Sequence, residues 1–350
     1  MGEAWHSARM RANRFDFLRL VFAAMVFVYH LVVLAALDVS GIWETHLARL
    51  AELSIQGFFI ISGALVFGSW ERSASVTDYV GKRLRRLYPA YAVIILVPAG
   101  VALSLGGALD GVVRYIGANL IFANFLAPDL PGLFQGQRFE AVNGALWTLK
   151  IEVMFYIALV GLGPVLLWLK GRHLGLVLLV LGVLYVGGEL WRSVFQSLAI
   201  SENAPIWATV ARQLPGQMAF FVSGIALWIW QDALRSWLRG IWRLGLLLLA
   251  ISLMVPGAEP LRAVGLAGLV AGIAWGRGPA VPAARYGDVS YGLYICHFPI
   301  VQALVASGAF AISPWLGSGL AVLLVLATSF MLWHFVERPA LRSDSHYRQT

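Results

Sequence analysis

Long apolar runs alternate with short polar segments along almost the whole chain of 350 residues. Each run is long enough, or nearly long enough, to cross the hydrocarbon core of a bilayer as a helix. The ten predicted spans are residues 16–37, 51–70, 87–105, 146–169, 174–191, 213–231, 243–256, 261–276, 289–308 and 315–336. The pattern predicts an all-α polytopic membrane protein with a single integral membrane domain over residues 1–350.

Two regions depart from this pattern. In residues 106–145 the apolar stretch VVRYIGANLIFANFLA is interrupted by Arg114, Asn119 and Asn124. We therefore expect a re-entrant or surface-lying element there, and not a span. Runs 243–256 and 261–276 are short for a full crossing and are separated only by PGAEP. They are either helices at a thin part of the membrane or one hairpin.

The composition agrees with a membrane protein, because 59% of the residues are apolar and only 13% are charged. The net charge of +8 would suit nucleic acid, but the basic residues lie in short clusters between the apolar runs. With a cytoplasmic N-terminus, 19 of the 26 Lys and Arg residues fall on the cytoplasmic side. The positive-inside rule favours this topology, which also makes the C-terminus cytoplasmic. Counting 106–145 as an eleventh span would place the later basic segments on the outer side of the membrane, against the positive-inside rule.

Two features that the sequence lacks argue against a metal or redox site and against a cleaved signal peptide. Cys296 is the single cysteine, so no intramolecular disulfide and no CxxC metal or redox site can form, and we expect no metal. Residues 1–14 lead into a full-length span without a small-residue cleavage pattern, so we expect the first span to be retained.

Arg19 and His30 lie within the first span, where polar side chains are costly. Eleven residues make three helical turns plus about 20°, so both side chains leave one face, ~16 Å apart along the helix. Ala23 and Val26 lie between them on that face and are small enough to leave a path for an elongated ligand. The alternative is that Arg19 snorkels to the interface and His30 binds a neighbouring helix.

A basic cluster precedes the third span in YVGKRLRRLYPAY, residues 79–91. Arg83 and Arg86 are three residues apart and so are neighbours on one helical face. Two guanidinium groups placed in this way suit phosphate oxygens, because each can donate two hydrogen bonds. Ordinary cytoplasmic anchoring, or binding of anionic lipid, is the alternative.

A carboxylate enters the fourth predicted span in NGALWTLKIEVMFY, residues 143–156. Glu152 has Thr148 and Tyr156 one turn to either side. A carboxylate about two turns inside a span is costly unless it is paired or used. The predicted topology gives Glu152 a depth similar to that of His30, so a pair between them is geometrically possible.

Two further motifs lie near the end of the chain. In DVSYGLYICHFP, Ser290, Tyr294 and His297 share one helical face, and a structural hydrogen bond is the alternative to a functional role for His297. In HFVERPA we expect Glu337 and Arg338 to close the last span through an ion pair or carbonyl contacts.

Taken in order, these fragments resemble the membrane-bound acyltransferase-3 family, stand-alone polysaccharide O-acetyltransferases included. The fragments are FDFLRLVFAAMVFVYH, GFFIISGAL, YVGKRLRRLYPAY, LWTLKIEVMFY, VSYGLYICHFPIV and HFVERP, and they extend from residue 15 to residue 339. The family moves acetyl or related groups onto sugars and other hydroxyl compounds. FDFLRL lacks the glycines common in the family, and Lys150 and Val153 replace a frequent Ser and Glu, which leaves the substrate less defined.

The resemblance implies roles for individual residues. Arg19 and His30 correspond to the functional arginine and histidine of the first helix, Arg83 and Arg86 to the cytoplasmic arginine pair, and Glu152 to the family's acidic residue. The implied donor is cytoplasmic acetyl-coenzyme A, with its phosphates at the arginine pair, its arm passing Arg19 and its thioester near His30. His30 oriented by Glu152 would act as general base, or would form an acyl-histidine. Further candidate substrate-site residues are Trp147, Tyr156, Ser290, Tyr294 and His297.

The expected acceptor is a sugar hydroxyl of a surface or exopolysaccharide, or of its lipid-linked precursor. Succinyl in place of acetyl, and an antibiotic or a Nod factor as the acceptor, are left open. Expected partners are membrane lipids, acyl-coenzyme A, this saccharide and other polysaccharide-assembly proteins, but no nucleic acid. The expected location is the bacterial inner membrane. The competing hypothesis is a transporter or flippase for lipid-linked sugars or small solutes, which also needs buried charges. It predicts movement of substrate without acyl transfer.

Overall fold

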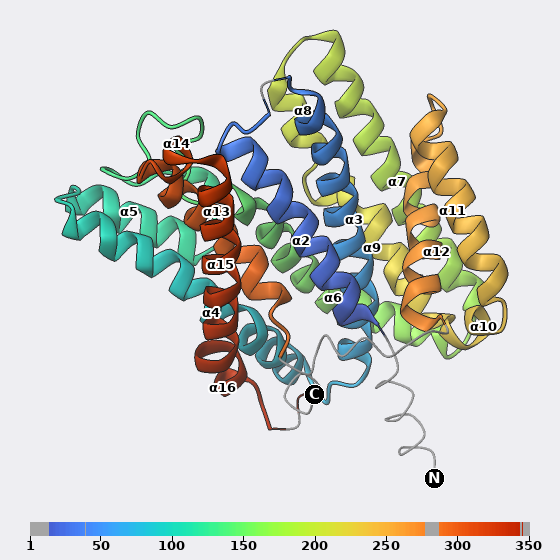
Figure 1. Ribbon diagram of the computed structural model, residues 1–350. Helices are drawn as coiled ribbons and strands as arrows, with labels where there is room; N and C mark the ends of the chain where they lie inside the picture. The colour runs from blue at the N-terminus through green and yellow to red at the C-terminus, as the bar shows by residue number, and fades with distance from the viewer. Residues whose placement is uncertain (1–13, 39, 277–286, 344, 346–350) are drawn as a thin grey trace. The chain divides into compact units, whose positions relative to one another are not determined.

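The protein is described by a computed structural model that covers residues 14–38, 40–276, 287–343 and 345 (Figure 1). The elements in these residues are α-helices and short 3₁₀ and π turns, which confirms the predicted all-helical fold. The two chain ends that the sequence places in the cytoplasm lie outside the described residues, so their orientation stays a prediction.

Six helical segments are long and apolar enough to cross a membrane. Each coincides with a predicted span, although several helices extend well beyond the apolar run because their polar ends remain helical. The segments are α2 (Phe15–Leu34), α3 (Ile42–Glu71), α4 (Val76–Ser104), Gly144–Lys170 with α6 (Trp147–Lys170), α7 (Leu174–Ser201), and Pro314–Ala340 with α15 (Pro314–Met331), the π-helix η5 (Leu332–Glu337) and α16 (Arg338–Ala340).

Four other predicted spans form shorter helices. They are α9 (Leu214–Ile229), α11 (Leu238–Met254), α12 (Arg262–Trp275) and α13 (Ser290–Ala306), with 16, 17, 14 and 17 residues. At 1.5 Å per residue these lengths are about 21–26 Å, less than the ~30 Å of a bilayer core. The expected number of about ten spans is therefore not confirmed, although the helices are where the sequence places them.

Of residues 106–145, only Gly144 and Ala145 belong to a candidate span. The others form α5 (Leu109–Leu120), the 3₁₀ turn η1 (Asn124–Leu126) and irregular chain. The buried amide of Asn119 donates to the carbonyl oxygens of Tyr115 and Ala127 at 2.9 and 2.8 Å, and the Tyr91 hydroxyl on α4 donates to the Asn119 carbonyl oxygen. Asn119, which interrupts the apolar sequence, thus satisfies the backbone where α5 ends.

The chain divides into two compact units. The first comprises residues Met1–Arg19, Ile55–Tyr79 and Ile151–Val281, and the second comprises Leu20–Ser54, Val80–Lys150 and Pro282–Thr350. The unit boundaries fall inside α2, α3, α4 and α6, so each of these helices contributes residues to both units.

Helices of the first unit approach closely where glycines remove the side chain. A Cβ on Gly63 of α3 would lie 2.0 Å from the Phe221 carbonyl oxygen of α9, and one on Gly224 would lie 1.9 Å from the Ile60 carbonyl oxygen. The neighbouring helices α11 and α12 (Figure 1) approach through Gly245, Gly265 and Gly268 in the same way. Small residues at such contacts are typical of helices packed in membranes.

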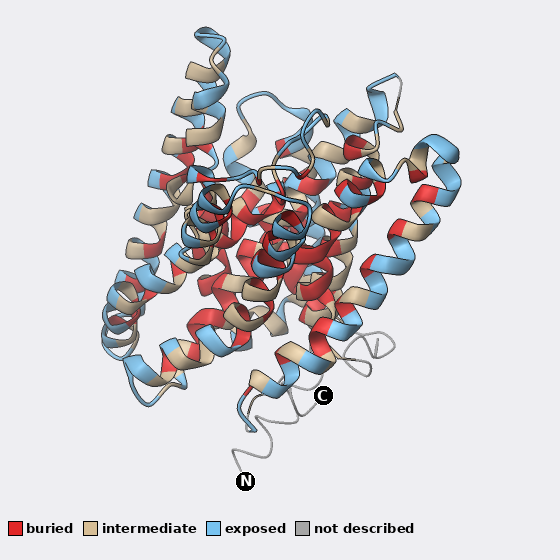
Figure 2. Ribbon diagram, turned by 90° about the vertical axis from the view of Figure 1, so that its left-hand side faces the viewer, coloured by how far each residue is buried: buried red, intermediate tan, exposed pale blue. Residues whose placement is uncertain are grey.

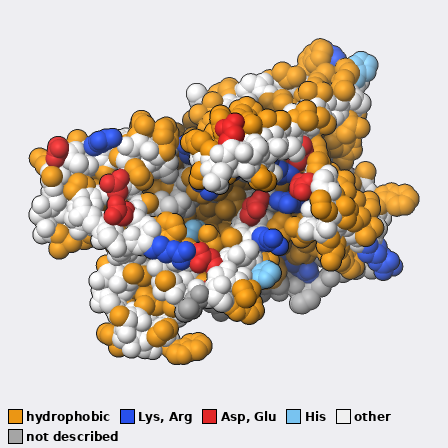
Figure 3. All heavy atoms as spheres, turned by 90° about the horizontal axis from the view of Figure 1, so that it is seen from above, with side chains coloured by type: hydrophobic (Ala, Val, Ile, Leu, Met, Phe, Trp, Pro, Cys, Tyr) orange, Lys and Arg blue, Asp and Glu red, His pale blue; other side chains and the backbone are white. Residues whose placement is uncertain are grey.

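Other surfaces of the first unit are apolar and exposed. On α7, Leu179, Val183, Val186 and Leu190 recur at helical spacing on one face and are 55–63% exposed. Figure 2 shows exposed positions recurring along the helices, and Figure 3 shows apolar side chains over much of one face of the molecule. An exposed apolar stripe of this kind is expected of a helix that faces lipid.

In the second unit, side-chain amides attach the segment before α6 to α13. Asn143 donates to the Ile295 carbonyl oxygen at 2.8 Å, and Gln302 donates to the carbonyl oxygens of Phe139 and Ala141 at 2.5 and 3.2 Å. A Cβ on Gly292 would lie 3.0 Å from the Ser329 Cα, so α13 also packs closely on α15. These contacts fix α13 on two sides.

The glycine contact between α3 and α9 yields a stability prediction. Gly63→Ala should lower the free energy of unfolding by about 1–3 kcal/mol, because the new methyl group would force two backbones apart. Gly161→Ala on α6 is the control, since no atom lies within 4 Å of its added Cβ. Thermal unfolding in detergent measures both. Equal melting temperatures for Gly63→Ala and wild type would contradict this packing.

Candidate active site

Two histidines contact each other in the second unit. His30 on α2 and His297 on α13 are 267 residues apart in sequence, and the Nδ1 of His30 lies 2.9 Å from the Nε2 of His297. Their ring centroids are 4.9 Å apart. His297 is fully buried, whereas His30 remains partly exposed. The pair therefore has one inner member and one member that another molecule can reach.

Aromatic and hydroxyl groups surround this histidine pair. Phe298 contacts the His30 ring edge to face at 5.1 Å, and the Tyr294 ring lies 6.0 Å from His297. The Tyr294 hydroxyl is 2.7 Å from the Thr148 hydroxyl at the start of α6. Of the predicted substrate-site residues, His297 thus contacts His30, and Tyr294 lies beside His297.

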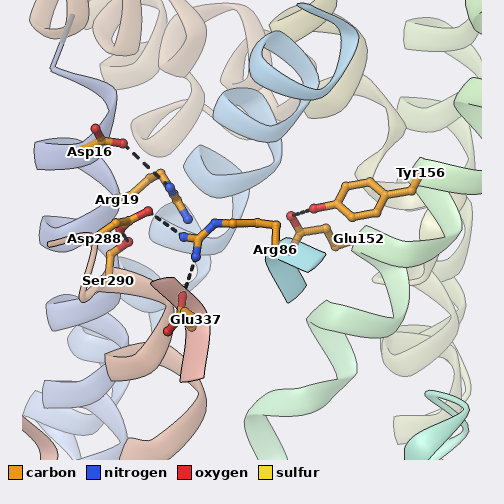
Figure 4. Close-up of polar contacts among 8 residues, drawn as sticks. All are labelled: Asp16, Arg19, Arg86, Glu152, Tyr156, Asp288, Ser290 and Glu337. Carbon is orange, nitrogen blue, oxygen red and sulfur yellow. Dashed lines mark hydrogen bonds and ion pairs between the residues drawn. The ribbon is translucent and has the colours of Figure 1, made fainter. Parts of the chain in front are cut away.

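A buried arginine with two carboxylates forms a second polar cluster in the same unit (Figure 4). The guanidinium of Arg86 on α4 donates to Asp288 at 2.5 Å and to Glu337 at the end of the π-helix η5. Arg86, Asp288 and Glu337 are 7%, 4% and 1% exposed. Glu337 does form an ion pair, but its partner is Arg86 on α4, and Arg338, which was expected to share this role, is exposed. We call these three residues the arginine cluster.

Neighbouring side chains complete the arginine cluster. The Ser290 hydroxyl donates to the second carboxylate oxygen of Asp288 at 2.5 Å, so this predicted substrate-site residue supports the ion pair. The rings of Tyr291 and Trp333 lie 5.4 and 5.9 Å from the Arg86 guanidinium carbon. The Tyr291 hydroxyl also donates to the Leu87 carbonyl oxygen at 2.9 Å. Cation–π contacts of this kind add to the stabilisation of the buried charge.

The sequence did not lead us to predict Asp288, although it lies in the same motif as Ser290, Tyr294 and His297. The signal that could have indicated it is the free-energy cost of burying a charged side chain without a partner. An arginine buried in an apolar protein needs a carboxylate partner, and Asp288 lies directly before an apolar helix. Nothing in a single sequence, however, links residue 86 to residue 288.

The surroundings of Arg19 correct one expectation. Arg19 forms an ion pair with Asp16 at 3.7 Å (Figure 4). Ala23 and Val26, expected to leave an open path between Arg19 and His30, are both 0% exposed. The expectation of an open path along this face is wrong, because small side chains let neighbouring segments pack directly onto a helix.

Glu152 lies in the first unit, on α6, and is partly buried. Its carboxylate accepts a hydrogen bond from the Tyr156 hydroxyl at 2.5 Å (Figure 4), and the Tyr156 carbonyl oxygen accepts one from Tyr79 at 3.2 Å. The nitrogen of His30 that an orienting carboxylate would contact is instead the one beside His297. A catalytic role for Glu152 stays a prediction.

Arg83 and Trp147, two further predicted site residues, are both half-buried. Arg83 lies one turn before Arg86 on α4. Trp147 is the first residue of α6. The phosphate-binding role of the arginine pair stays a prediction, and Arg86 has the additional role of holding two carboxylates together.

Comparison with known proteins identifies the class. Residues 13–334 match the family model described as the acyltransferase domain, type 3. The chain is 28% identical over 370 residues to Nodulation protein 10 of Rhizobium leguminosarum bv. viciae, covering 96% of this chain and 95% of that protein. It is 26% identical over 357 residues to an O-acetyl transferase of Shigella phage Sf6, covering 96% and 98%. No solved structure gives a significant match.

The family match spans nearly all of the chain, from before α2 to the π-helix that carries Glu337. The chain therefore belongs to the acyltransferase-3 family, which confirms the resemblance seen in the sequence motifs. It is an acyltransferase, and its apolar helices make it a multi-pass membrane protein.

The arginine cluster predicts a large effect of one substitution. Arg86→Met should lower the free energy of unfolding by about 3–5 kcal/mol, because it leaves two buried carboxylates without their cation. Arg85→Met, at the exposed neighbouring position, is the control and should change stability little. Thermal unfolding of both purified variants measures the difference. Similar melting temperatures for the two would show that the ion pairs do not hold this unit together.

Proposed function

We propose that the protein is a membrane O-acyltransferase that moves an acetyl or similar short acyl group from acyl-coenzyme A to a sugar hydroxyl. The acceptor would be a surface or exopolysaccharide, or its lipid-linked precursor, at the bacterial inner membrane. Membership of the acyltransferase-3 family supports this proposal, as does similarity to a phage protein named O-acetyl transferase.

The observation that carries the proposal is the position of His30. It is a partly exposed imidazole within an apolar helix, and hydrogen bonds to Val26 and His297 hold it in place. An imidazole can remove the proton from an attacking hydroxyl, a contribution of typically ~10²- to 10⁴-fold to the rate. A polar side chain within a membrane span is costly, and this cost is explained if the side chain performs this chemistry.

The donor site is proposed at the basic start of α4. Arg83 is proposed as the main phosphate ligand of the two arginines, because it is half-buried and can reach solvent, whereas Arg86 is 7% exposed. Arg19 would then bind the arm of the donor. Trp147, Tyr156 and Glu152 are proposed to act on the acceptor side.

Donor binding can be tested without knowing the acceptor. Acetyl-coenzyme A at 100 times its dissociation constant should stabilise the wild-type protein by about 2.7 kcal/mol in thermal unfolding. Arg83→Ala should lose most of this shift, because it removes a phosphate ligand. Arg85→Ala, which changes the same charge at an exposed neighbour, should keep it. A well-folded wild-type protein that acetyl-coenzyme A does not stabilise would favour the transporter alternative.

Catalysis by His30 is tested by group transfer. Membranes from producing cells are supplied with radiolabelled acetyl-coenzyme A, and the label that enters the saccharide fraction is measured. His30→Ala should lose about 10²-fold or more of the rate while the melting temperature changes little. His46→Ala, at an exposed position of α3, is the matched control. Full transfer by His30→Ala would remove His30 from the mechanism.

A further inference from the structure

The protons of the histidine pair can be assigned from their partners. The Nδ1 of His297 lies 3.1 Å from the Leu293 carbonyl oxygen, which can only accept a hydrogen bond. Therefore Nδ1 of His297 carries a proton. A neutral imidazole carries only one N–H, and a charged one would be costly in these apolar surroundings. The Nε2 of His297 is therefore an acceptor.

The same reasoning extends to His30. Its Nδ1 lies 2.9 Å from the Nε2 of His297 and 3.0 Å from the Val26 carbonyl oxygen. Both of these atoms are acceptors, so Nδ1 of His30 carries the proton and is shared between them. In neutral His30 the other nitrogen, Nε2, then holds a lone pair and is the basic atom.

We propose that His297 is a positioning residue that holds His30 in the tautomer whose Nε2 is the base. The inference rests on the proposed function of His30 as general base. It assigns the orienting role to a second histidine, where a carboxylate would be the usual partner. His297 itself is fully buried and its Nε2 contacts His30, so its effect passes through His30.

The surrounding contacts keep the pair in this arrangement. Phe298 packs against the His30 ring, and Phe27 packs against the His297 ring with centroids 6.0 Å apart. His297 lies on α13, whose backbone is bound by Asn143 and packed on α15. Both rings are therefore restricted, and the hydrogen bond selects the tautomer.

The transfer step follows from this proton assignment. The Nε2 of His30 takes the proton of the acceptor hydroxyl as its oxygen bonds to the thioester carbonyl carbon. The carbon–sulfur bond then breaks, and the coenzyme A sulfur leaves as a thiolate that receives the proton from Nε2. His30 is positively charged between these events, and its Nδ1–H then donates more strongly to the neutral Nε2 of His297. The step leaves both histidines as they began.

Two variants of one residue separate positioning from structure. His297→Gln offers an amide oxygen that can accept the Nδ1 proton, whereas His297→Phe fills the space without an acceptor. We expect His297→Gln to retain the rate constant kcat within about 10-fold, and His297→Phe to lose about 10²-fold at unchanged KM for acetyl-coenzyme A, as expected when a base is lost. Equal rates for the two variants would overturn the inference.

The tautomer itself is measured by nitrogen NMR of the purified protein labelled at histidine. His30→Gln and His297→Gln assign the two residues through the signals that they remove. A protonated Nδ1 and a bare Nε2 on His30, together with the same tautomer on His297, whose bare Nε2 accepts the hydrogen bond from His30, support the assignment. A proton on Nε2 of His30 overturns it.

The tautomer of His30 can be measured by NMR whether or not the protein transfers an acyl group. If wild-type protein shows the expected tautomer but transfers no acyl group, the proposed function fails and the hydrogen-bond assignment stands. If transfer occurs while His30 carries its proton on Nε2, the proposed function stands and His297 does not position the base.

Discussion

A buried guanidinium held between two carboxylates is the interaction on which the second unit depends. Arg86 comes from α4, Asp288 directly precedes α13, and Glu337 ends the π-helix that continues α15. None of these charges could be buried alone, because desolvation of an unpaired ion costs more than packing can recover. The three segments must therefore come together, and the wide π turn is part of how Glu337 reaches its place.

The helix α13 connects this ion cluster to the histidine pair. Its start is fixed through Asp288 and Ser290, and its first two turns are also held by Asn143 and by the close contact at Gly292. His297 follows Ser290 by about two turns on the same helix. The charged groups of the arginine cluster thus lie at the N-terminal end of α13, whereas the histidine pair further along the helix is held by hydrogen bonds between neutral groups. No charged residue of α13 therefore lies beside His30.

Helix positions could be predicted from the sequence because apolar runs of this length have few alternatives in a membrane. Helix ends could not, since the polar start of α4, including Arg83 and Arg86, remains helical beyond the apolar run. His30 was recognised because a polar residue in a span is expensive. Its partner was not, because a contact between residues 30 and 297 leaves no trace in the spacing of either motif. His297 was accordingly assigned to the substrate site.

The burial of Ala23 and Val26 limits how a donor can reach His30. Both side chains are fully covered, so the donor does not contact α2 at these two positions. Small residues there serve close packing, as the glycines of the first unit do. His30 nevertheless remains partly exposed, with Nδ1 turned toward His297. We expect a donor to approach the opposite edge of the imidazole, the edge that carries Nε2, because the proton assignment leaves this nitrogen basic.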